Sequence, residues 1–405
     1  MDNCLVVSLK ECIFAVLKSA KILSLDKKPF SISQMNIDNP FITFGYESAA
    51  YFCDRREETR HLISLLTNGN HVALVSPRRM GKTGLLHHCF AQPEMRDRYY
   101  TFLIDIYATK NLQDLVFQMG RHIIHRLRPR GQAAVNQFLK FVTSLRTGIS
   151  FDGMGNASWN LSVGDIKSPT FTLEEIFNYL KAADKKCIVA IDEFQAIIDY
   201  PEKNVEALLR TYVQQCRNAV FVFSGSQKRM MSEMFTSPAR PFYQSTSMMF
   251  LKPVPLQEYE AFSKHHFEAA QKTIDDTVMK TLYERFDGTT WYLQKVLNQL
   301  FATTVHATVE DMEAAVEQIV NQNEEAYKDT LFQLTIRQRD LLVAIGREGK
   351  ASQITGASFV QRHKLSSFSS VQKAAKILEE KQLLTHQQGI YEVYDKFLAE
   401  WLRRD

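Results

Sequence analysis

The 405 residues contain no long apolar run, no paired cysteine motif and no large excess of charge of one sign. No stretch reaches the roughly 18 apolar residues that a membrane helix needs. The six cysteines are scattered without a Cys-x-x-Cys pair, which argues against a zinc site or a disulfide framework and suits a reducing cytoplasm. A net charge of only +4 does not imply a general polyanion binder. We therefore expect a cytoplasmic globular protein that makes no membrane contact.

The first residues do not resemble a secretion signal. Asp2 comes before the apolar patches, and Lys10 and Glu11 interrupt them, whereas a signal peptide is basic first and then continuously apolar. A short amphipathic helix is one interpretation. The other is that translation starts at Met35, just before fold-like sequence begins. We treat residues 1–36 as an N-terminal extension.

The segment from Phe52 to about Pro241 alternates between strand-like and helix-like patterns. Such alternation predicts a parallel sheet with crossover helices. Residues 146–168 break it with glycines and short alternating stretches, which favours a β-hairpin insertion. We expect an α/β core domain over residues 37–254.

The pattern becomes purely helical after Pro255, with no strand between the helices. This predicts a small helical bundle, expected as a lid, over residues 255–330. Residues 331–405 change character again, since three short helices come before two strands around residues 386–389. Three helices followed by a β-hairpin are typical of a winged-helix domain.

Two helix starts in this last segment have capping-box spacing. Thr335 and Gln338 stand three residues apart before an apolar-periodic run, and Ser369 and Gln372 repeat the spacing before the third helix. We therefore expect both pairs to cap their helices.

Residues 76–83, Ser-Pro-Arg-Arg-Met-Gly-Lys-Thr, lie between the apolar run Val72–Val75 and the start of an apolar helix. They fit the Walker A pattern Gly-x-x-x-x-Gly-Lys-[Ser/Thr] at every defined position except the first, where Ser76 replaces glycine. Ser76 is small and Pro77 stiffens the turn, so we expect the substitution to be tolerated. The alternative is a strand-turn-helix that matches the pattern by chance.

A Walker A loop binds phosphate because successive backbone N–H groups point into one concavity above a helix N-terminus. Lys82 would reach the β- and γ-phosphates of ATP, and the Thr83 hydroxyl would bind Mg²⁺. Gly81 would let the backbone approach the phosphates closely. The loop residues that we assign to the nucleotide are Arg79, Met80, Gly81, Lys82, Thr83 and Gly84.

A second apolar run, residues 187–191, ends in Asp192 and Glu193. Two carboxylates at the end of a buried strand are costly unless they have a cation or a water to serve. As a Walker B motif, Asp192 would hold the magnesium ion through water, and Glu193 would act on the attacking water. The alternative is an acidic pair that caps the next helix.

A third apolar run ends in Ser224, Gly225 and Ser226. When such a strand lies between the strand of the Walker A loop and the Walker B strand, a polar side chain at its end contacts the γ-phosphate or the attacking water. We assign this role to Ser226 first and to Ser224 second, with a plain turn as the alternative.

Arg240 stands in a loop that leaves the core, between alanine and proline. A guanidinium from such a loop neutralises charge on the γ-phosphate, and such a contact is worth about 10³ to 10⁵ in rate. We place Arg240 among the catalytic residues, with a surface salt bridge as the alternative.

Five stretches of the sequence carry a family resemblance: FCDRREE, SPRRMGKTGLL, IDEFQAI, FSGSQKRMMSEMF and ARPFY. Together they resemble the archaeal-type ATPase group of the STAND class, a group of AAA+-like P-loop NTPases, over residues 40–405. The resemblance implies that Phe52, Arg55 and Glu58 help to hold the base, and it supports the choice of Arg240.

Two positions depart from this group. The first cradle glycine is Ser76, and the Gly-His-Pro signature of the helical domain keeps Gly288 but has Thr290 where proline is usual. Proline there helps to start a helix that faces the nucleotide. We expect Thr290 to cap this helix instead.

The resemblance implies a slow ATPase that works as a nucleotide-dependent switch, with a helical lid over ATP and a winged helix that reports the state. We expect an unidentified protein partner and nucleotide-dependent self-assembly. The alternative is a DNA-associated, initiator-like or transcription-regulating ATPase, although weak DNA binding is all that the modest charge favours. A third reading, a non-hydrolysing nucleotide binder, is disfavoured by the complete set of Lys82, Thr83, Asp192 and Glu193.

Overall fold

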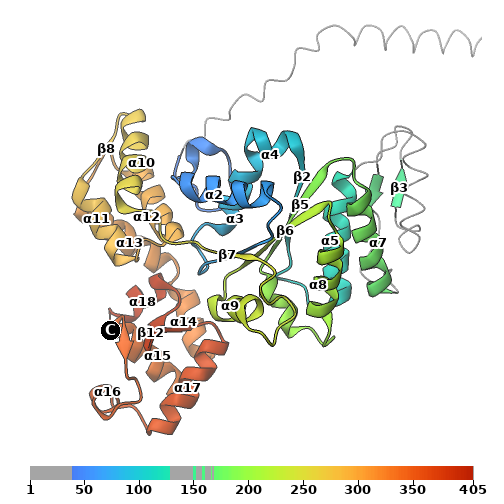
Figure 1. The fold of residues 1–405 in the computed structure, drawn as a ribbon. Helices are drawn as coiled ribbons and strands as arrows, with labels where there is room; N and C mark the ends of the chain where they lie inside the picture. The colour runs from blue at the N-terminus through green and yellow to red at the C-terminus, as the bar shows by residue number, and fades with distance from the viewer. Residues whose placement is uncertain (1–38, 128–148, 152–156, 160–165, 167, 405) are drawn as a thin grey trace, which may run out of the picture. The chain divides into compact units, whose positions relative to one another are not determined.

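The computed structural model describes residues 39–127, 149–151, 157–159, 166 and 168–404 (Figure 1). The predicted extension over residues 1–36, the alternative start at Met35 and most of the predicted insertion lie outside the described residues. The description below concerns residues 41–405, which form one unit.

A five-stranded sheet with the order β2-β5-β6-β1-β7 forms the first half of this unit (Figure 1). Every neighbouring pair is parallel, as the alternating pattern predicted. The strands are β1 (Val72–Val75), β2 (Tyr99–Asp105), β5 (Lys186–Asp192), β6 (Ala219–Gly225) and β7 (Ser247–Phe250).

Helices cover both faces of this sheet, which is why its strands read as continuous apolar runs. Ile188 and Ala190 pack into one core with α2 and α3, whereas Val189 and Ile191 pack into the other core with α5, α7 and α8. The helical elements are η1 (Ala49–Tyr51), α2 (Arg56–Thr67), α3 (Lys82–Ala91), α4 (Pro93–Arg98), α5 (Leu112–Arg126), α7 (Pro169–Ala182), η4 (Phe194–Asp199), α8 (Val205–Gln215) and α9 (Lys228–Thr236).

Two short strands lie within the stretch where the sequence predicted an insertion. Strand β3 (Ile149–Phe151) pairs with β4 (Ala157–Trp159) in antiparallel register.

A helical bundle follows the sheet and packs around its own apolar core. The sequence pattern was wrong in excluding strands here, because β8 and β9 form a parallel ladder of two residues each, too short to leave a periodic signal. The last two helices of the bundle meet at Asn323. The elements are α10 (Leu256–Ala269), β8 (Thr273–Ile274), α11 (Asp276–Arg285), α12 (Thr290–Thr303), β9 (His306–Ala307), α13 (Val309–Gln322) and α14 (Glu324–Phe332).

The C-terminal part has the predicted three helices and wing, plus a short strand β10 and a last helix α18. Thr335 and Gln338 form the expected capping box. The expected second box is wrong, because α17 begins at Phe368 and places Ser369 and Gln372 inside the helix. The elements are α15 (Ile336–Glu348), β10 (Ala351–Ser352), α16 (Ala357–Arg362), α17 (Phe368–Glu380), β11 (Leu384–Gln387), β12 (Ile390–Val393) and α18 (Lys396–Leu402).

Among the residues that the structure describes, no helix combines the length and the apolar character that crossing a membrane requires.

Candidate functional site

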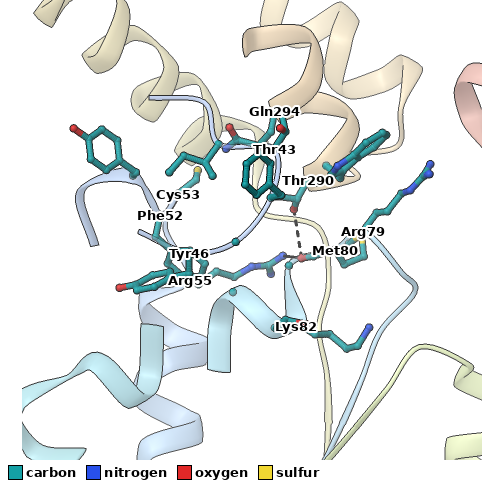
Figure 2. A pocket seen from close by; sticks show the side chains of 18 of the residues that line it. Thr43, Tyr46, Phe52, Cys53, Arg55, Arg79, Met80, Lys82, Thr290 and Gln294 are labelled. Atoms are coloured by element: carbon teal, nitrogen blue, oxygen red, sulfur yellow. Dashed lines mark hydrogen bonds between the residues drawn. The ribbon is translucent and has the colours of Figure 1, made fainter. Parts of the chain in front are cut away.

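A cavity of about 290 Å³ opens beside the loop between β1 and α3, which we call the P-loop (residues 76–81). Figure 2 shows Lys82 at one end of the cavity and Thr43 and Gln294 at the other. Its walls come from the segment before α2, the P-loop and the first turns of α3 and α12. The cavity therefore has a phosphate-binding motif at one end and space for a further group beyond it.

The P-loop leaves β1 as a continuation of the sheet and then turns sharply. The Ser76 N–H donates to the Gly225 carbonyl at 3.3 Å, so the position of the missing glycine is extended and buried. Arg79 and Gly81 have left-handed backbone angles, with φ of 69° and 88°. A β-carbon on Gly81 would meet no protein atom within 4 Å. Gly81 is therefore required by its backbone angle and leaves the space above it free for a ligand.

Lys82 begins α3 and is only 6% exposed. Its Nζ donates to the Ser76 carbonyl at 3.3 Å. Burial lowers the pKa of this amine, and the nearby carboxylates of Glu193 and Asp192 oppose the change. Among the described residues this buried ammonium group has one long hydrogen bond, so an anionic ligand would give it a stronger partner.

Thr83 and Asp192 meet as the Walker A and B interpretation requires. The Thr83 hydroxyl donates to Asp192 Oδ2 at 2.7 Å, and Asp192 is 5% exposed at the end of β5. A hydroxyl and a buried carboxylate are the hard oxygen ligands that Mg²⁺ prefers. The described residues hold no group of three or more His, Cys, Asp or Glu that could bind a metal. The ion's other ligands would therefore be phosphate and water, as is usual for Mg²⁺.

Glu193 lines the cavity beside the P-loop. Its Oε2 accepts hydrogen bonds from the Ser226 hydroxyl at 2.6 Å and from the Gln195 amide at 2.5 Å. Ser226, the first choice from the sequence, therefore lies next to the Walker B carboxylate, whereas Ser224 is fully buried in β6. The sequence interpretation missed Gln195, because a glutamine in a short 3-10 helix carries no pattern.

Arg240 is not brought to the cavity. Its Nη2 lies 2.8 Å from Glu206 Oε2 on α8, and it is absent from the residues that line the site. Burial raises the pKa of Glu206, and the guanidinium of Arg240 opposes the rise. Within one chain, Arg240 makes the salt bridge that the sequence analysis left as its alternative.

Arg55 lines the cavity but turns its guanidinium to the protein. It is 2% exposed and donates to Glu58 Oε1 at 2.7 Å, to the Lys252 carbonyl at 2.6 Å and to the Met80 carbonyl at 3.1 Å. Figure 2 shows its contact with Met80. Arg55 therefore ties the P-loop backbone at Met80 to Glu58 and to the Lys252 carbonyl.

Phe52 packs against Gly84 on the first turn of α3. A β-carbon at Gly84 would lie 3.2 Å from the Phe52 ring, so glycine allows this close contact. Phe52 also stacks on His88, with ring centres 4.6 Å apart. Gly84 thus shapes the cavity wall through the aromatic ring that it admits.

The cavity is also lined by residues that the sequence did not single out. Phe44 is 87% exposed, and Tyr46 bonds through its hydroxyl to His88. Gln294 on α12 is 6% exposed, and its Oε1 has no hydrogen-bond partner among the described residues. Isolated side chains on a loop and one helical glutamine leave no motif, which is why sequence reasoning missed them.

Thr290 does not cap α12 as expected. Thr289 holds the cap position, and Thr290 is the first helical residue. The Thr290 hydroxyl instead donates to the Met80 carbonyl at 3.4 Å, and the Trp291 N–H donates to the Arg79 carbonyl at 3.0 Å. The start of α12 therefore binds the P-loop backbone directly (Figure 2).

Both P-loop arginines reach the C-terminal part of the chain. Arg79 Nη1 donates to Asp395 Oδ2 at 3.1 Å and to the Tyr292 hydroxyl, and its guanidinium lies 4.2 Å from the Trp291 ring centre. Arg78 Nη1 donates to Gln382 Oε1 at 2.7 Å. The sequence assigned Arg79 to the nucleotide, but its side chain is engaged by the helical bundle and the winged helix.

Comparisons with known proteins match two parts of the chain to known domains. Residues 52–296 match the model of an ATPase domain predominantly from Archaea, and residues 325–404 match that of a probable winged helix domain. No curated protein matches the chain.

Two solved structures have a similar fold. A Walker-type ATPase of Pyrococcus abyssi is 18% identical, covers 90% of this chain and 99% of its own, and gives a TM-score of 0.62. The ORC2 protein of Aeropyrum pernix, solved as ADPNP–ADP complexes, is 14% identical, covers 87% of this chain and 93% of its own, and gives 0.53. The expected α/β class, a P-loop core with a C-terminal winged helix, is confirmed. The chain belongs to the family of ATPase domains found predominantly in Archaea.

Proposed function

We propose that this protein is a slow, Mg²⁺-dependent ATPase of the STAND class that acts as a nucleotide-dependent regulatory switch in the cytoplasm. Membership of the ATPase family and the meeting of Lys82, Thr83, Asp192 and Glu193 at one end of a cavity support the ATPase part. In this function residues 37–254 would be the catalytic core, residues 255–330 the lid, and residues 331–405 a winged helix that reports the nucleotide state.

The residues at the phosphate end of the cavity have different roles in the reaction. The N–H groups at the start of α3 and the Lys82 ammonium would bind the phosphates. Thr83 and Asp192 would hold Mg²⁺, which supplies charge neutralisation when bound. Glu193 takes the proton of the attacking water. Arg240 would act on the γ-phosphate only from a neighbouring copy, since its own chain ties it to Glu206.

One observation carries the switch, namely that Arg78 and Arg79 of the P-loop are held by Gln382 and Asp395 of the winged helix. The γ-phosphate of ATP, which ADP lacks, would bring negative charge next to the same two guanidinium groups and compete with these partners. A ligand shifts a conformational equilibrium by its difference in affinity for the two states. ATP therefore favours a state in which the winged helix is released from the P-loop.

A released winged helix exposes surface for a protein partner or for a second copy of the chain. Release and hydrolysis together would define an on-state that lasts as long as ATP remains uncleaved. Slow turnover suits this role, because a switch needs a lifetime rather than a high flux.

Amide hydrogen exchange of the full chain without nucleotide, with ADP and with ATP tests this function. A Glu193→Gln variant keeps ATP intact, because its amide cannot take a proton from water, and hydrolysis should fall by roughly 10² or more. In that variant ATP should raise exchange in α18 and β12, whereas ADP should leave it low. Equal exchange in all three states would remove the switch, and equal turnover in the variant and the wild type would remove Glu193 from the mechanism.

A further inference from the structure

The carboxylate of Glu193 is held on one of its two oxygens only. Gln195 Nε2 lies 2.5 Å and Ser226 Oγ lies 2.6 Å from the same atom, Oε2. Within the described part of the chain, no hydrogen bond reaches Oε1. A carboxylate accepts hydrogen bonds but donates none, so the contact also identifies the Gln195 atom as the amide nitrogen.

The backbone places Gln195 for this contact. Glu193 has φ of 56°, a left-handed conformation that is costly for a residue other than glycine. The turn ends β5 and starts the 3-10 helix η4, which brings the side chain at position 195 back beside that at position 193. Strain at a single residue beside a cavity is commonly kept for function.

The neighbouring strand is shaped around the same glutamine. Gln195 is 3% exposed, and its Oε1 has no hydrogen-bond partner among the described residues. A β-carbon on Gly225 would lie 2.5 Å from that oxygen and 2.4 Å from Met231 Sδ. The glycine at the end of β6 therefore makes room for a buried amide of which only the N–H₂ group is used.

We propose that Gln195 is a positioning residue for hydrolysis, which together with Ser226 fixes Glu193 through Oε2 and presents Oε1 to the attacking water. This inference rests on the proposed ATPase function. Gln195 contacts neither water nor phosphate in it and acts only through Glu193. Gln195 is only two residues from Glu193 in the sequence, but only the folded structure shows that the two side chains meet.

The chemical step makes the division between the two oxygens useful. The water oxygen forms a bond to the γ-phosphorus as the bond from that phosphorus to the β–γ bridging oxygen breaks, which releases ADP and phosphate. The water proton goes to Glu193 Oε1. Two donors on Oε2 hold the carboxylate plane and stabilise its charge before the transfer, so the base needs no reorientation in the transition state.

The test is Gln195→Met in the full chain, which keeps the length of the side chain and removes both N–H donors. We expect kcat to fall about tenfold or more, a part of the roughly 10²- to 10⁴-fold that a general base contributes, while the Kd for ATP stays within about twofold because Gln195 makes no ligand contact. Met231→Leu is the matched control, since it repacks the same site and leaves the Glu193 hydrogen bonds in place. It should keep nearly wild-type kcat. Gln195→Leu, which also carries no donor, should behave like Gln195→Met and replaces it if that variant does not fold.

A double-mutant cycle with Ser226→Ala separates positioning from a general packing role. Because both donors act on one oxygen, their losses in kcat should not multiply. Multiplicative losses, a parallel loss of ATP affinity, or an unchanged kcat in both Gln195 variants would overturn the inference and leave the ATPase proposal intact. A wild-type chain that binds ATP without cleaving it would overturn both.

Discussion

Arg79 in the P-loop and Asp395 at the start of the last helix form an ion pair with 3.1 Å between Nη1 and Oδ2. The other oxygen of Asp395 accepts the N–H groups of Phe397 and Leu398 and so caps α18. The Tyr292 hydroxyl joins the pair, because it contacts Arg79 and accepts the Lys396 N–H at 3.0 Å. One carboxylate thus connects the nucleotide loop with the folding of the C-terminal helix.

Asp395→Asn should loosen the winged helix without unfolding it. Asparagine is as good an N-cap as aspartate, so α18 keeps its cap, while the charge that faces Arg79 is lost. Side chains at about a third exposure make a modest pair, so we expect a coupling of about 1 kcal/mol or less. Amide exchange in α18 and the P-loop should rise several-fold. Asp340→Asn, which removes only a long pair to its exposed neighbour Arg339, is the control, and equal exchange in both variants would argue against the pair as a latch.

Lys82→Ala should abolish ATP binding or weaken it severely, because the phosphates lose their nearest cation. Titration with a fluorescent ATP analogue measures this, and unchanged affinity would refute the assignment of the P-loop as the phosphate-binding site.

The pH dependence of ATP binding by the wild-type protein is a separate test of Lys82. Burial holds the Lys82 pKa below its usual 10.5, so the free protein loses this proton earlier than an exposed lysine would. Phosphate favours the charged form, so affinity should fall as alkaline pH rises through the lowered pKa.

The parallel sheet and the Walker motifs could be predicted from the sequence because each depends on local patterns. Continuous apolar runs such as Val72–Val75 need helices on both faces, and Gly81 and Lys82 have fixed offsets in their motif. The contact of Arg79 could not be predicted in this way. Arg79 stands at a variable position of the Walker A pattern, its partner Asp395 lies 316 positions away, and no spacing rule joins two such distant residues.

Gln195 and Gln294 show a second limit. Each is a single glutamine outside any motif, and its meaning depends on which neighbouring atoms remain without partners. Burial and unsatisfied atoms are properties of the packed core. Short elements are lost for a related reason, since the β8–β9 ladder of two residues per strand has no period to detect.

Arg240→Ala should slow hydrolysis and leave the affinity for Mg²⁺-ATP near the wild-type value, if Arg240 serves a neighbouring copy. Mixing this variant with Lys82→Ala protein then restores part of the activity, because each variant supplies what the other lacks. Turnover in mixtures at fixed total concentration measures the rescue. Glu206→Gln frees the guanidinium and should increase the activity of the assembled form. Absence of rescue would leave Arg240 with its salt bridge only.

The winged helix should bind duplex DNA weakly and without sequence preference. Residues 331–405 carry 12 basic and 8 acidic side chains, which is less basic than a dedicated DNA reader. Within α17, the exposed Lys376 lies 4.0 Å from Glu380, so part of its charge is already paired. Of the Arg, Asn and Gln side chains that commonly read base edges, the described helix α17 contains only Gln372, near its start.

A salt series with the full chain and duplexes of unrelated sequence tests this prediction, with and without ATP. Binding should be equal for all duplexes and should fade by physiological salt, because contacts to phosphate alone depend on counterion release. Lys373→Glu combined with Lys376→Glu should abolish what remains at low salt, and the same reversal at Lys280, on α11 of the helical bundle, should not. Tight, sequence-selective binding that persists at physiological salt would instead make DNA the target of the switch.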